Sequence, residues 1–289
     1  MRAAVFIVLT TLFTGSATAL DQSVPAAIYT DPPTDAAHPA RMTVLHIPSD
    51  GVLINSVVYS PPGAGAHPTL IICHGLPGNE KNLDIAHTVR RAGWNAVTFN
   101  YRGAWGTPGS FRFAQNLEDA AAVVAWLRTP KVAAQLGIDT KRIVIAGHSM
   151  GGWVAAHTAA RDPRLSGAIL ISAADMGGRD GMPREQLVQH MAENMEALAG
   201  VTPGSMADEL RTHSRDFALT NAVAGLARTP LLVLTSDDDF AASIQTWTKA
   251  VEAKGNRRIT AAHVHTDHGW SDRRIALETH ILNWLTALR

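Results

Sequence analysis

Residues 142–152 read Arg142-Ile143-Val144-Ile145-Ala146-Gly147-His148-Ser149-Met150-Gly151-Gly152. The apolar run before Gly147 predicts a strand covered by helices on both faces, and the pattern from Trp153 to Arg161 predicts a helix. A serine flanked by glycines at such a junction is typical of a tight turn that exposes its hydroxyl at the end of a sheet. The helix N-terminus also favours a developing oxyanion beside Ser149. We therefore predict that Ser149 is a nucleophile.

Strand-like runs and helical patterns alternate through most of the chain. We expect eight strands, at Met42–Ile47, Val52–Tyr59, Thr69–His74, Asn95–Tyr101, Arg142–Ala146, Gly167–Ser172, Leu231–Ser236 and Arg258–Val264. This alternation predicts an α/β fold with a doubly wound, mostly parallel eight-stranded sheet in one domain, residues 41–289. Residues 20–40 lack periodicity and are expected to form an extended lead-in. Asn116 is expected to cap a helix, with Asp119 in its first turn.

One insert, at about residues 175–227, interrupts the alternation. It carries a helical pattern from Arg184 to Leu198 and five of the chain's eight methionines: Met176, Met182, Met191, Met195 and Met206. Methionine fills irregular apolar space and adapts to varied partners. The insert predicts a small helical lid over the active site, in which Met191 and Met195 line the substrate pocket. The alternative is an ordinary two-helix excursion whose methionines belong to the core.

A serine nucleophile needs a base and an acid, and both are expected near the ends of the last strands. Of the 13 histidines, His268 lies on the loop just after the last predicted strand, where catalytic groups gather in open α/β sheets. His148 is expected to point away from Ser149 and either to pack beside it or to support another residue of the site. Three carboxylates follow the strand Leu231–Ser236, namely Asp237, Asp238 and Asp239. The order along the chain is therefore serine, aspartate, histidine, which suits such a triad.

An oxyanion hole is predicted from the loop Gly75-Leu76-Pro77-Gly78, which follows the strand Thr69–His74. One donor in such a site is the amide after the nucleophile, here that of Met150, and the other comes from this loop. Leu76 would supply the second amide, because Pro77 has no N–H group.

Three stretches carry a resemblance to a known family. They are His74-Gly75-Leu76-Pro77-Gly78-Asn79-Glu80-Lys81-Asn82, Asn100-Tyr101-Arg102-Gly103 and Asp267-His268-Gly269-Trp270-Ser271-Asp272-Arg273. With the Ser149 motif they resemble the α/β-hydrolase superfamily, and within it bacterial esterases and hydrolases of the dipeptidyl-aminopeptidase and acylaminoacyl-peptidase type. The chain departs from one large lipase branch, which has His-Gly-Gly-Gly in the loop, and it has no N-terminal propeller.

This resemblance implies hydrolysis of carboxylic esters through an acyl-enzyme, with a small-molecule ester or short peptide as substrate. An aminopeptidase or acyl-peptidase using the same triad is one alternative, and a non-catalytic binding protein on the same fold is another. In the superfamily the acid commonly stands three residues after a small residue that closes the seventh strand. Ser236 looks like that residue, which makes Asp239 the expected acid. Asp238 would take its place if the strand ended one residue earlier.

The first nineteen residues are expected to form a signal peptide. Arg2 precedes an apolar run over residues 3–13, and Ala17-Thr18-Ala19 has the form of a cleavage site. The mature protein is therefore expected to be secreted or periplasmic. No later run is long enough to span a bilayer.

The composition indicates a protein of zero formal net charge, and the motifs lead us to expect no cofactor. Lys plus Arg and Asp plus Glu both number 25, so no charge excess favours nucleic acid. The single cysteine, Cys73, is expected to be a buried strand residue. No phosphate loop, cofactor fingerprint or metal-ligand spacing is present. His263 and His265 could form a metal pair, but no third ligand is suggested nearby, and we expect no metal site.

Overall fold

The computed structural model describes residues 23–179 and 181–288, so the expected signal peptide lies outside the described residues. The centre of the domain is an eight-stranded sheet with the strand order β1-β2-β4-β3-β5-β6-β7-β8. The strands are β1 (Arg41–Ser49), β2 (Val52–Ser60), β3 (His67–Cys73), β4 (Asn95–Phe99), β5 (Ile138–His148), β6 (Gly167–Ile171), β7 (Leu231–Thr235) and β8 (Ile259–His263). β2 pairs antiparallel with β1 and β4, and all other pairs are parallel. The predicted fold class is confirmed.

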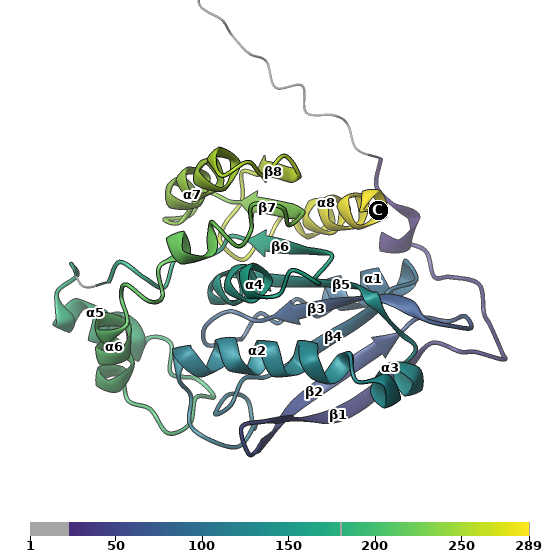
Figure 1. Ribbon diagram of the computed structural model, residues 1–289, viewed down its shortest axis with the longest axis horizontal. Coiled ribbons are helices and arrows are strands. Elements are labelled where there is room, and N and C mark those ends of the chain that lie inside the picture. The colour runs from purple at the N-terminus through teal and green to yellow at the C-terminus, as the bar shows by residue number, and fades with distance from the viewer. Residues whose placement is uncertain (1–22, 180, 289) are drawn as a thin grey trace, which may run out of the picture.

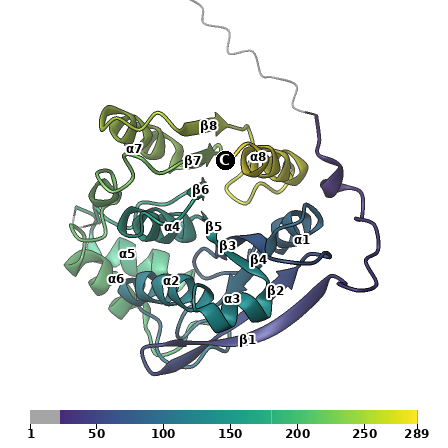
Figure 2. The same ribbon diagram turned by 45° about the vertical axis from the view of Figure 1, so that its right-hand side comes forward.

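Helices cover both faces of the sheet (Figures 1 and 2). On one face lie α2 (Phe113–Leu127), α4 (Met150–Arg161) and α7 (Ala241–Ala253), and on the other lie α1 (Leu83–Arg91) and α8 (Arg274–Ala287). The short α3 (Pro130–Leu136) precedes β5, and a 3-10 turn at Ala26–Ile28 interrupts the lead-in. Within the described residues, no helix has the length and apolar character needed to cross a membrane.

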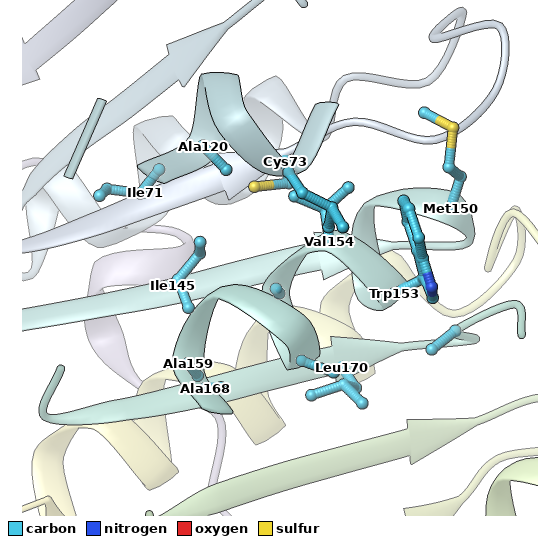
Figure 3. Close-up of a cluster of buried hydrophobic side chains, with 14 of the residues drawn as sticks. Ile71, Cys73, Ala120, Ile145, Met150, Trp153, Val154, Ala159, Ala168 and Leu170 are labelled. Carbon is cyan, nitrogen blue, oxygen red and sulfur yellow. The ribbon is translucent and has the colours of Figure 1, made fainter. Parts of the chain in front are cut away.

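Alternate side chains of each central strand enter two separate cores. In β3, Ile71 and Cys73 pack with α2 and α4, whereas Leu70 and Ile72 pack with α1 and α8. Successive side chains of a strand point to opposite faces, so a strand covered twice needs a continuous apolar run. Figure 3 shows the first core around Trp153. Cys73 is fully buried there, and burial raises the pKa of its thiol to about 12.

The start of α2 differs from the prediction. The helix begins at Phe113 rather than after Asn116, and both Asn116 and Asp119 are fully buried inside it. The Asp119 carboxylate accepts hydrogen bonds from the backbone N–H of Arg102 (2.8 Å), the Arg102 guanidinium (2.7 Å) and the Ser49 hydroxyl (2.6 Å). The residue therefore serves a buried tertiary ion pair, which local sequence signals do not reveal.

The insert between β6 and β7 is helical, as predicted. It contains α5 (Arg184–Ala192), α6 (Pro203–Thr212) and the 3-10 turn η2 (Leu219–Ala222). The two α-helices lie side by side beyond the strand ends (Figure 1). The predicted helix from Arg184 to Leu198 is shorter in the structure and ends at Ala192. Of the five methionines, Met176, Met191 and Met206 are buried, and the other two pack partly buried against the same core.

Candidate active site

Ser149 occupies a strained turn between β5 and α4. Its φ and ψ angles are 56° and −122°, a combination that L-residues rarely adopt. Its N–H donates to the carbonyl of Ile171 in β6 (3.0 Å), and its own carbonyl accepts from Ala174 (3.0 Å). The flanking glycines are required, because a Cβ on Gly147 would lie 1.9 Å from the Gly151 carbonyl oxygen. Backbone packing therefore holds the serine at the end of β5.

His268 lies in the loop after β8, and its Nδ1 is 2.7 Å from Oδ2 of Asp238. The Asp238 side chain is 7% exposed and also accepts from the Ser236 hydroxyl (2.9 Å) and the Phe240 backbone N–H (3.0 Å). Burial alone would raise the pKa of Asp238, but these hydrogen bonds, that from His268 foremost, hold the pKa below its ordinary value. The carboxylate is thus ionised and oriented toward the imidazole.

The prediction that Asp239 contacts this histidine is wrong. β7 ends at Thr235, one residue before the expected end at Ser236. Counting three residues onward from the last strand residue therefore reaches Asp238, whereas Asp239 is exposed to solvent. The chain pattern identified the right cluster of carboxylates but placed the end of the strand one residue too late.

Two buried groups support the Asp238–His268 pair. Nε2 of His148 lies 2.8 Å from the backbone carbonyl of His268 and must donate to it, since a carbonyl oxygen can only accept. Burial lowers the pKa of His148 to about 4, so its ring is neutral. On the other side, the Ser172 hydroxyl accepts from the Trp270 indole (3.0 Å) and lies 2.6 Å from Oγ of Ser236. This contact agrees with the expectation that His148 packs beside Ser149 or supports another residue of the site.

The Gly75–Gly78 loop lies against Ser149. A Cβ built on Gly75 would stand 3.1 Å from the Ser149 Cβ. The loop is held by a hydrogen bond from the Trp105 indole to the Pro77 carbonyl (2.9 Å) and by one from the His74 ring to the Gly75 carbonyl (2.8 Å). Burial lowers the pKa of His74 to about 4, so this ring is also neutral.

A pocket of about 190 Å³ joins these groups, since Ser149 and His268 both line it. Apolar side chains form most of its wall: Leu76, Met150, Ala174, Met176, Leu187, Met191, Leu210 and Phe240. Arg179, His190 and Asn194 add polar groups, and all three come from the insert. Met191 therefore lies where the sequence predicted it, whereas Met195 packs against the core outside the wall.

Sequence patterns did not indicate the polar groups that the insert adds to this pocket, and Arg179 is one of them. One Nη donates to the Asp175 carbonyl (3.1 Å), but Nε is buried without a hydrogen-bond partner among the described residues. Burial lowers the pKa of the guanidinium, though not enough to discharge an arginine. A partly satisfied cation thus faces the pocket that Ser149 opens into.

A larger cavity, of about 470 Å³, lies elsewhere, between Trp94, Arg142 and Pro230. These residues stand near the amino ends of the parallel strands. Ligand sites of open α/β sheets lie at the carboxyl ends, so the smaller pocket around Ser149 is the candidate active site.

Comparison with known proteins agrees with this architecture. The sequence profile of the α/β hydrolase fold matches residues 32–271, and the chain belongs to this family. An esterase of the archaeon Pyrobaculum calidifontis superimposes with a TM-score of 0.66 over 88% of both chains at 21% identity. EstE1, a carboxylesterase from a metagenomic library, gives a TM-score of 0.65 at 23% identity, over 87% of this chain and 91% of its own. These likenesses establish the shared fold.

Among curated sequences, an uncharacterised 31.7 kDa protein of Escherichia coli is 33% identical over 125 residues. The matched segment is 42% of this chain and 41% of that protein, so the likeness covers less than half of either.

Proposed function

We propose that this protein is a serine hydrolase that cleaves carboxylic esters of small molecules through an acyl-enzyme intermediate. One observation carries the proposal: Ser149, strained on its turn, shares a pocket with His268, whose Nδ1 is bound by the buried Asp238. Structural likeness to proteins described as esterases is in keeping with it.

The reaction follows from the arrangement of protons in the site. Because Nδ1 of His268 is committed to Asp238, Nε2 is left to accept the Ser149 hydroxyl proton as Oγ bonds to the ester carbonyl carbon. The N–H groups of Met150 and Leu76 would stabilise the oxyanion, and each such donor typically contributes about 3 kcal/mol. His268 then returns the proton to the leaving alkoxide as the C–O bond breaks. In the second half of the reaction, water gives a proton to His268 and attacks the acyl carbon. The bond to Ser149 Oγ then breaks, and His268 returns the proton to Oγ.

The pocket favours a short acyl group. Its volume of about 190 Å³ is below the range of roughly 300–1,000 Å³ that is common for drug-sized ligands. Helices α5 and α6 would then act as the predicted lid, since Leu187, Met191 and Leu210 close one side of the pocket.

Ser149→Ala tests the mechanism against a series of p-nitrophenyl esters and aminoacyl p-nitroanilides. Turnover of short-chain esters should fall by about 10⁴-fold or more, with the melting temperature close to that of the wild type. Ser243→Ala, at an exposed serine of α7, is the control and should keep full activity. Ester turnover that persists in Ser149→Ala within about tenfold contradicts the mechanism. Anilide turnover without ester turnover would assign a peptidase instead.

A fluorophosphonate probe separates an enzyme from a binding protein on the same fold. The probe should modify the wild type at Ser149, as located by peptide mass spectrometry, because only an activated serine attacks the phosphorus. An unlabelled wild-type protein would favour a non-catalytic role.

We also propose that the protein acts outside the cytoplasm, on the basis of the signal-peptide pattern in residues 1–19. N-terminal sequencing of the protein from its native host should find a start near Leu20. A retained Met1 or Arg2 would contradict export.

A further inference from the structure

A cluster of three potential metal ligands lies beside the active-site loops. Asp237 follows β7, His263 ends β8, and His265 lies in the loop after β8. Sequence spacing suggested only the two histidines as a pair. The third ligand, Asp237, comes from the neighbouring strand, because β7 and β8 are parallel and Thr235 is in register with His263. One potential ligand atom from each of the three side chains lies within 4.8 Å of the others.

The distances suit a small cation. Nε2 of His263 is 2.9 Å from Oδ1 of Asp237, and Nδ1 of His265 is 3.2 Å from Oδ2. Ligands about 2.0–2.1 Å from a tetrahedral zinc ion stand roughly 3.3 Å from one another, so only small side-chain movements are needed. The planes of the two imidazole rings are inclined to each other by 87°.

Neighbouring groups already orient the ligands. The Thr235 hydroxyl lies 3.0 Å from Nδ1 of His263, which directs Nε2 of the same ring toward Asp237. The backbone N–H of Asp237 donates to the Thr266 carbonyl (2.9 Å), so the two loops are joined beneath the cluster. Outer contacts that fix a histidine ring are a regular feature of metal sites.

We propose that Asp237, His263 and His265 form a binding site for a divalent transition-metal ion of the zinc type. Zinc is commonly coordinated by two imidazoles and one carboxylate, with a water molecule as the fourth ligand. Mg²⁺ and Ca²⁺ instead prefer oxygen ligands. The ion links the loop that carries Asp238 to the loop that carries His268 and thereby stabilises this edge of the sheet. Its binding does not depend on the proposed hydrolase activity.

The test is calorimetric titration of the chelator-treated full-length protein with ZnCl₂, with MgCl₂ as a comparison. His265→Ala removes a ligand whose side chain is 87% exposed, so the substitution leaves packing intact. Asp237→Asn removes the charged ligand at constant size. The matched control is His213→Ala, since His213 pairs with Asp216 and, among residues 23–179 and 181–288, no third potential ligand joins that pair.

The wild type and His213→Ala should each bind one Zn²⁺ per chain at this site, with affinities that agree within about twofold. His265→Ala and Asp237→Asn should each weaken binding by about tenfold or more, since each removes one of only three protein ligands. A hundredfold excess of Zn²⁺ over its Kd should raise the wild-type melting temperature by about 5 °C or more, and the rise should vanish in both variants. The proposal is overturned if the wild type shows no saturable binding, or if His265→Ala binds Zn²⁺ as tightly as His213→Ala does.

Discussion

Asp238→Asn replaces one of the two carboxylate oxygens with an amide NH₂ group, and the hydrogen bonds of the site decide which of the two positions that group takes. Oδ1 of Asp238 accepts backbone N–H groups from Phe240 and Ala241, each at 3.0 Å, and only an oxygen can fill that position. The new NH₂ group must therefore take the place of Oδ2, facing Nδ1 of His268 and the Ser236 hydroxyl.

This orientation reverses the hydrogen bond to His268. An NH₂ group donates, so Nδ1 of His268 has to accept and the ring proton moves to Nε2. In that tautomer Nε2 cannot take the proton of Ser149. A wrong tautomer of this kind costs about 10⁴ in kcat where it has been measured in a serine protease, so we expect a loss of about 10³- to 10⁴-fold. That loss corresponds to roughly 4–5.5 kcal/mol of transition-state stabilisation.

Stability should change little, because the hydrogen-bond chain can reverse. The Ser236 hydroxyl can accept from the new amide and donate to the Ser172 hydroxyl, 2.6 Å away, which also accepts from the Trp270 indole. The melting temperature of Asp238→Asn should therefore stay within a few degrees of the wild-type value. A large drop would show that the substitution acts through folding instead of through the tautomer.

The assay is steady-state hydrolysis of the best p-nitrophenyl ester by the wild type, Asp238→Asn and Asp239→Asn. Asp239 is exposed, so its amide variant should keep kcat within about twofold to threefold. If Asp239→Asn is the crippled variant and Asp238→Asn is nearly normal, the assignment of the acid from this geometry is refuted.

Three further outcomes are expected. Arg102→Met should lower the melting temperature by about 10 °C, because it leaves the buried Asp119 carboxylate without its cation, a change that typically costs 3–5 kcal/mol. Because burial lowers the pKa of His157 to about 4, well below its usual unfolded value of about 6.5, the neutral ring contributes stability above about pH 6.5 that is lost as the pH falls toward 4. Urea denaturation curves between about pH 6.5 and pH 4 should show this decrease in the free energy of unfolding. In His157→Leu the decrease should be smaller by about 3 kcal/mol. Arg179→Gln should lower kcat/KM by about tenfold for the half-ester of a short dicarboxylic acid, because the free carboxylate of that substrate pairs with the guanidinium. For a neutral ester of equal length, which has no such carboxylate, kcat/KM should fall by less than about threefold. Equal losses for the two substrates would contradict that pairing.

Local sequence determined the sheet and the turn that carries Ser149. The apolar run before Gly147 predicts a strand buried on both faces, because side chains that alternate between two covered faces must all be apolar. The glycine at 147 is dictated by a contact within the turn, since a Cβ there would meet the Gly151 backbone, whereas a Cβ on Gly151 would meet the carbonyl of Cys73 in β3. The position of His268 on the loop after the last strand follows from the chain order alone. The sequence signals of these features lie within short stretches of the chain, so a single sequence carries them.

The partners of these residues were decided by the tertiary structure. Whether Asp238 or Asp239 reaches His268 depends on the residue at which β7 stops, and that end is set by pairing with β8, whose residues lie some thirty positions further along the chain. Asp237 joins His263 for the same reason, since parallel pairing brings the two strand ends together.

Two buried groups show the same dependence on distant segments. Asp119 has the spacing of a helix-start residue but forms an ion pair with Arg102 instead. Arg179 enters the pocket only because the insert folds back over the strand ends. Hydrogen bonds and ion pairs between distant segments form only when the two backbones are placed to within about an ångström. A hydrophobic pattern is less demanding, because it requires only that the apolar side chains lie on the buried face of their helix or strand.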